Sequence, residues 1–159
     1  MRAMQSNDVI AFFAQLIEES REAYVQDLEA MSEEQVSRAP GGTARSGLDF
    51  TYEVVVVNQR IAARLRGEEP APWPFESWVT APEGWSRDQA VQAIRDSMNE
   101  ALEAWKAVDP EKVFQPLVED KPGTRPASFA FMVAHHAGYH DAQLNYLQSL
   151  AGDQEVHWK

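Results

Sequence analysis

Apolar residues recur every three or four positions in four long segments, and this spacing limits the possible folds more than any other feature of the chain. The segments are residues 6–31, 46–66, 86–109 and 126–151. Such a repeat gathers apolar side chains on one face of an α-helix. The valine run 54–57 would also suit a strand, but the periodic residues and alanines around it favour a helix. Four amphipathic helices must bury these faces against one another, so the sequence predicts an all-α four-helix bundle.

Glycine, proline and small polar residues mark the ends of the predicted helices. The SEEQ run at 32–35 has the form of a capping box and predicts a short further turn after the first long helix. Gly67 and Gly152 are expected to stop the second and fourth helices. Thr124 is expected to cap the fourth helix, with the proline two residues later in its first turn. These signals leave no boundary for a second domain, so we expect residues 1–159 to form one domain.

The charge and composition of the chain exclude several classes of function. The 159 residues carry a net charge of −11, so Lys and Arg are too few to neutralise phosphates along a nucleic acid or an anionic membrane surface. Without cysteine, the chain has no disulfides, thiolate zinc sites, iron–sulfur clusters or cysteine nucleophiles. It begins without a secretory signal, and no apolar stretch reaches about 18 residues, so we expect a cytoplasmic protein.

A long connection, residues 68–85, separates the second and third predicted helices. Four prolines keep this segment irregular. Its three tryptophans indicate that it packs onto the bundle, and they are Trp73, Trp78 and Trp85. The segment then either covers one end of the bundle or forms a lid or wall over a binding site.

Three of the four histidines fall within six residues, in the segment HHAGYHDAQ. His136 and His140 are four residues apart, so on a helix their rings lie one above the other and can bind one metal ion. His135 lies about 100° further round the helix, and we expect it to be exposed or hydrogen-bonded in the core. Residue 137 is alanine, so the segment is not the HExxH motif of zinc proteases. The histidine pair predicts two ligands of a divalent metal.

A metal ion held by two histidines needs at least a third protein ligand, and the second predicted helix offers Glu53 and Asn58. A glutamate among valines is unusual unless it is paired or bound to a metal. The alternative for Glu53 is an exposed place near the helix start. Two imidazoles and one carboxylate suit Zn or Ni first, and also Fe or Mn, with positions left open for water or substrate. No histidine of the segment follows a glutamate by three residues, so a ferritin-like pair of metals is not expected.

The end of the chain resembles the fourth-helix signature of the DinB/YfiT-like superfamily. That signature has the form H-x-x-x-H-x-x-Q, an apolar helix end and a short tail, here formed by His136, His140, Gln143, Leu144, Leu147, Gly152, His157 and Trp158. The resemblance implies an up-down-down-up four-helix bundle, often a homodimer, with a divalent metal held by three histidines. His136 and His140 match two of them. The third would lie on the second helix, which has no histidine, and Glu53 falls at its position.

The resemblance also implies a reaction. Characterised members transfer low-molecular-weight thiols to electrophiles, or isomerise with a thiol, so we expect a metal-dependent thiol S-transferase or a hydrolase. The metal would activate a bound thiol or water. In this hypothesis the metal ligands are Glu53, His136 and His140, and the side chains that support them or face a small-molecule substrate are Asn58, Tyr139 and Gln143. The alternative is a non-catalytic small-ligand-binding or stress-associated dimer with a vestigial metal site, walled by the tryptophan-rich segment.

Overall fold

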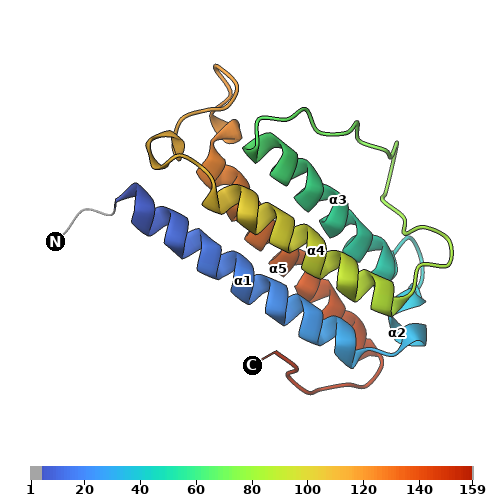
Figure 1. Cartoon of the computed structure of the whole chain (residues 1–159). Coiled ribbons are helices and arrows are strands. Elements are labelled where there is room, and N and C mark those ends of the chain that lie inside the picture. The colour runs from blue at the N-terminus through green and yellow to red at the C-terminus, as the bar shows by residue number, and fades with distance from the viewer. Residues whose placement is uncertain (1–4, 159) are drawn as a thin grey trace.

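The computed structural model describes residues 5–158 and contains helices joined by turns and irregular segments (Figure 1). The helices are α1 (Ser6–Ala30), α2 (Glu33–Ser37), α3 (Gly47–Leu65), α4 (Arg87–Lys106) and α5 (Pro126–Leu150), with short 3-10 turns η1 (Pro110–Lys112) and η2 (Pro122–Thr124). The described residues form no strand, and the valine run 54–57 lies within α3. The prediction of an all-α bundle is therefore confirmed.

The four long helices pack side by side along a common axis. α1 packs against α4 and α5, and α3 packs against the same two helices. In Figure 1, α1 and α5 run in one direction, and α3 and α4 run in the opposite direction. Because α3 and α5 are neighbours of opposite direction, Gly47 at the start of α3 lies beside Leu144 in the second half of α5. None of the described helices is long and apolar enough to cross a membrane.

The core is built from the predicted apolar stripes. Its largest fully buried side chains come from all four long helices and include Ile17, Tyr24, Leu28, Val54, Ile94, Met98, Trp105 and Leu144. The Trp105 indole Nε1 donates a hydrogen bond to the Ile10 carbonyl of α1 at 2.9 Å. This bond satisfies the polar atom of a buried indole and ties α4 to α1.

The helix ends follow the local signals in the sequence, with one exception. Ser32 and Gln35 form the predicted capping box of α2. Gly67 and Gly152 both adopt positive φ directly after a helix, a conformation that glycine accepts without strain. The prediction that Thr124 caps α5 is wrong: its hydroxyl donates to a carbonyl of the preceding turn, and no side chain caps α5. The helix begins at a proline instead, which has no N–H to satisfy.

The connection between α3 and α4 is irregular, as its prolines predict. Its three tryptophans lie in different surroundings. The Trp85 ring packs edge-on against Tyr52 of α3, with centroids 5.3 Å apart. Trp73 contacts Phe75 within the connection itself. Trp78 is the most exposed of the three. The segment therefore contacts α3 through a few side chains, and most of its residues face solvent.

Candidate metal centre

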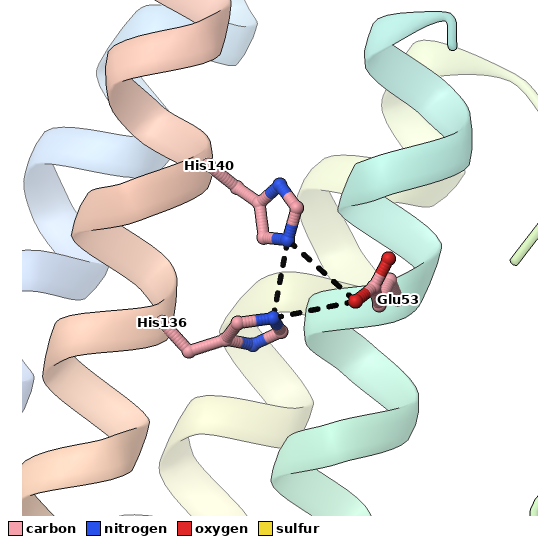
Figure 2. Close-up of side chains that lie close together, drawn as sticks. All are labelled: Glu53, His136 and His140. Carbon is pink, nitrogen blue, oxygen red and sulfur yellow. Dashed lines mark hydrogen bonds and ion pairs between the residues drawn. The ribbon is translucent and has the colours of Figure 1, made fainter. Parts of the chain in front are cut away.

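Two histidines of α5 and one glutamate of α3 meet between these helices (Figure 2). The two ring Nε2 atoms of His136 and His140 lie 3.1 Å apart. Glu53 Oε1 lies 3.6 Å from His136 Nε2 and 3.9 Å from His140 Nε2. The structure thus brings together the three residues that the sequence predicts as metal ligands.

The helical periodicity explains why these side chains converge. His136 and His140 are separated by about one turn, so both rings project from the same face of α5. This face points at α3, and Glu53 projects back toward it (Figure 2). The neighbouring His135 is exposed and stacks on Phe131 with ring centroids 5.0 Å apart. As predicted, it lies on a different side of the helix from the pair.

A hydrogen bond and burial hold His140 in the form that a metal requires, and burial keeps His136 uncharged. His140 is fully buried, and its Nδ1 lies 2.7 Å from Gln143 Oε1. The amide oxygen can only accept, so Nδ1 carries the proton and Nε2 presents a lone pair in the neutral ring. Burial, followed by the charge of His136, lowers the pKa of His140 to about 4. Burial also lowers the pKa of His136. Both imidazoles are therefore neutral at pH 7.

Glu53 is kept ionised by a partner on its other oxygen. Arg45, just before α3, forms a hydrogen-bonded ion pair with Glu53 Oε2. Burial raises the pKa of this carboxyl, but the hydrogen bond and charge of Arg45 oppose burial, and the pKa lies below its usual value. Arg45 engages Oε2, so Oε1 remains directed at His136 and His140.

The spacing of the three donor atoms fits a small divalent ion. Their separations define a triangle whose circumcentre lies about 2.1 Å from each atom, within the range of zinc bonds to imidazole nitrogen and carboxylate oxygen. His136 Nδ1 is buried with no hydrogen-bond partner, so the ring of His136 lacks the bond at Nδ1 that Gln143 provides for His140. Three donors leave at least one position for water or substrate in a tetrahedral or larger coordination shell.

The other residues predicted near the metal divide into two groups. Gln143 bonds His140 directly, and the Tyr139 ring lies edge-on to His140 with centroids 4.9 Å apart. Asn58 is not part of the centre. It is fully buried, and its amide nitrogen lies 3.5 Å from Ser97 Oγ of α4. Five residues turn the helix by about 140° beyond a full turn, so Asn58 faces α4 while Glu53 faces α5.

Only one of the three tryptophans predicted to form a loop wall lies beside the centre. Trp78 lines a pocket of about 320 Å³ together with Arg45, Tyr139 and Gln143. The Arg45 guanidinium lies over its ring at 4.8 Å from the centroid. Trp73 and Trp85 are not among the residues of this pocket. Trp73 packs on Phe75 within the connection and Trp85 packs on Tyr52 of α3, so Trp78 is the only one of the three tryptophans that lines this pocket.

Two residues of the centre do not appear among the sequence predictions. Phe50 stacks on His140 with ring centroids 5.4 Å apart and an interplanar angle of 10°. It lies three residues before Glu53, so helical spacing alone would have placed it on the same face. Arg45 lies outside the helix, and periodicity gives no information about it. Only the folded segment before α3 brings its guanidinium to Glu53.

These features define the chain first as a helical bundle with a candidate metal centre between two of its helices. The family model of the DinB superfamily matches residues 16–144, so the chain belongs to the DinB superfamily. The match includes Glu53, His136 and His140, whereas the tail that extends to Trp158 lies outside it. Searches of curated proteins and of solved structures gave no match.

Proposed function

We propose that Glu53, His136 and His140 bind a divalent metal ion, with Zn or Ni preferred and Fe or Mn also compatible with the ligands. The observation that carries this proposal is the triangle formed by one carboxylate oxygen and two neutral imidazole nitrogens. Membership of the DinB superfamily supports it. Glutamate in place of a third histidine lowers the charge of the centre by one, which favours harder ions than a three-histidine site would.

Metal binding is tested by titrating zinc, nickel and manganese chlorides into chelator-treated protein and measuring the heat released. We expect one ion per chain in the wild type. His136→Ala should weaken binding by about a hundredfold or more, because it removes one of three ligands. His135→Ala is the matched control, because this neighbouring histidine is exposed and faces away from Glu53. An absence of binding for all three metals, or equal losses in the two variants, would reject the proposal.

We further propose that the centre belongs to an enzyme that transfers a low-molecular-weight thiol or hydrolyses a small substrate. A bound divalent ion would supply a positive charge that lowers the pKa of a thiol or water in the open position. The protein orients the ligands: Gln143 fixes the ring of His140, and Arg45 fixes the carboxylate of Glu53. Tyr139, more than half exposed beside His140, stands where a substrate would enter.

Thiol transfer is tested with monochlorobimane and either glutathione or cysteine. In this reaction the thiolate sulfur forms a bond to carbon, chloride leaves, and the thiol proton passes to solvent. The zinc-loaded wild type should accelerate the appearance of fluorescence over the uncatalysed rate, and His136→Ala should not. If loaded protein shows no acceleration with either thiol, the transferase proposal fails for these thiols, and ester hydrolysis becomes the test of the water-activating alternative.

One observation favours a second function, a non-catalytic bundle in which the cluster is purely structural. The His136–His140 contact at 3.1 Å and the Arg45–Glu53 ion pair satisfy most of the cluster without an ion. In that case His136→Ala would lower the free energy of unfolding and leave the metal content unchanged. The titration above separates the two functions, since only the metal centre requires binding that depends on His136.

A further inference from the structure

A pocket of about 320 Å³ opens beside the candidate metal centre, on the side of the buried ring of His140. It lies between the segment that precedes α3 and the outer face of α5. Residues that line it include Arg45, Phe50, Trp78, Tyr139, Gln143 and Tyr146. Four of these touch the centre directly: Arg45 pairs with Glu53, and Phe50, Tyr139 and Gln143 contact His140. A molecule in this pocket would therefore be separated from the ligands by one layer of side chains.

The rim of the pocket is made of aromatic rings that remain in contact with water. Trp78 is 66% exposed, Tyr139 57% and Tyr146 63%. They come from the α3–α4 connection and from α5, which are distant in the sequence and adjacent here. Large apolar rings that gather at one opening, each with a face in solvent, indicate a surface that gains free energy by covering an apolar ligand.

The lining of the pocket lacks the acidic residues that dominate the chain. The protein carries 25 Asp and Glu residues and a net charge of −11. None of the described residues that line this pocket is acidic, and Arg45 is the single charged residue among them. Glu53 engages one end of its guanidinium, which carries five N–H donors in total. The remaining donors can receive a planar anion such as a carboxylate.

We propose that this pocket binds a small aromatic carboxylate, with the acid group at Arg45 and the ring between Trp78 and Tyr146. The volume is near the lower limit for small-molecule sites, about 300–1,000 Å³, so one ring or two fused rings suit it better than a larger ligand. The inference goes beyond the proposed function, because it names a ligand for a pocket beside the centre rather than for the metal itself. Binding itself needs only the pocket.

The proposal is tested by calorimetric titration with 2-naphthoate and with 2-naphthamide, which share a shape and differ in charge. The carboxylate should bind wild-type protein about tenfold or more tightly than the amide. Trp78→Ala should weaken naphthoate binding about tenfold, because it removes one aromatic wall. Trp73→Ala is the matched control on the same connection and outside the pocket, and it should change the affinity less than about twofold.

Tyr146→Ala provides a second pocket variant, at a side chain exposed enough that folding does not depend on it. It should also weaken naphthoate binding, by about threefold or more. Equal affinity for the acid and the amide would overturn the proposed role of Arg45. Unchanged naphthoate binding in both Trp78→Ala and Tyr146→Ala would overturn the proposed site.

Each titration is run on chelator-treated protein and again on zinc-loaded protein. Naphthoate binding to the chelator-treated form, sensitive to Trp78, supports the pocket even if no metal binds, in which case only the proposed function fails. If zinc binds but naphthoate binds to neither form, the pocket proposal fails and the metal centre stands. If both hold, zinc should tighten naphthoate binding, because the ion adds positive charge beside Arg45.

Discussion

The ion pair between Arg45 and Glu53 should contribute measurably to the stability of the metal-free protein. Glu53→Gln keeps the shape of the side chain and removes its charge, which leaves the Arg45 guanidinium without a counter-charge. Arg45→Gln leaves the opposite charge unpaired. If the pair holds the carboxylate in place, the losses in free energy of unfolding of the two single variants should add up to more than the loss of the double variant.

The burial of the two side chains determines how much free energy of unfolding each substitution should remove. Arg45 is 14% exposed and Glu53 20% exposed, so the pair lies between a surface pair and a buried pair. Exposed pairs contribute less than about 1 kcal/mol. The loss of one partner from a fully buried pair costs about 3–5 kcal/mol. We therefore expect about 2 kcal/mol for each single substitution, about 2.5 kcal/mol for the double substitution, and a coupling energy of about 1.5 kcal/mol.

The assay is urea unfolding followed by far-UV circular dichroism at pH 7, with a chelator present so that no metal contributes. The control is the same cycle on Glu18 and Lys106, an ion pair of 3.2 Å whose side chains are 45% and 42% exposed. That cycle should give a coupling energy below about 0.5 kcal/mol. Additive effects of Arg45→Gln and Glu53→Gln, with no more coupling than the control, would refute the reasoning that this pair orients the carboxylate.

Two further substitutions test buried polar groups of the bundle. Burial, and then the Asp27 carboxylate, raise the pKa of Asp141 to about 8. Between about pH 4 and pH 8 the folded protein therefore keeps a proton on Asp141 that the unfolded chain loses. The contribution of Asp141 to the free energy of unfolding falls as the pH rises through this range. Asp141→Asn should raise the free energy of unfolding at pH 8 and leave it unchanged at pH 4. The gain at pH 8 should be about 1–3 kcal/mol, because Asp141 is only partly buried. An equal effect at both pH values would contradict this expectation. Trp105→Phe removes the hydrogen bond to Ile10 and leaves a small cavity. Urea unfolding should show a loss of about 2–3 kcal/mol in the free energy of unfolding. A loss below about 0.5 kcal/mol would show that the bond contributes little.

The periodic features of the sequence predicted most of the fold and the central part of the site. Apolar stripes at helical spacing gave the long helices, since side-chain burial follows the 3.6-residue repeat. The same repeat placed His136 and His140 on one face of a helix, and both rings project from the same face of α5 toward α3. Glu53 was found as a polar residue among valines, because a buried charge implies a partner.

Features that depend on how the segments meet could not be predicted in this way. Arg45 lies in an irregular segment, so only the fold shows that it reaches Glu53. Asn58 was expected near the metal because it lies on the same predicted helix as Glu53, but the two side chains face different helices. Trp73 and Trp78 are the same residue type in the same connection, and which of them lines the pocket follows from the path of the connection.

The most direct test of the metal centre is an anomalous-scattering map from crystals of protein purified without a nickel column and soaked in a zinc salt. We expect one strong peak about 2 Å from each of Glu53 Oε1, His136 Nε2 and His140 Nε2. Arg45 should remain on the second oxygen of Glu53. A map with no peak between α3 and α5, or with zinc bound only at exposed residues such as His135, would contradict the proposed metal centre.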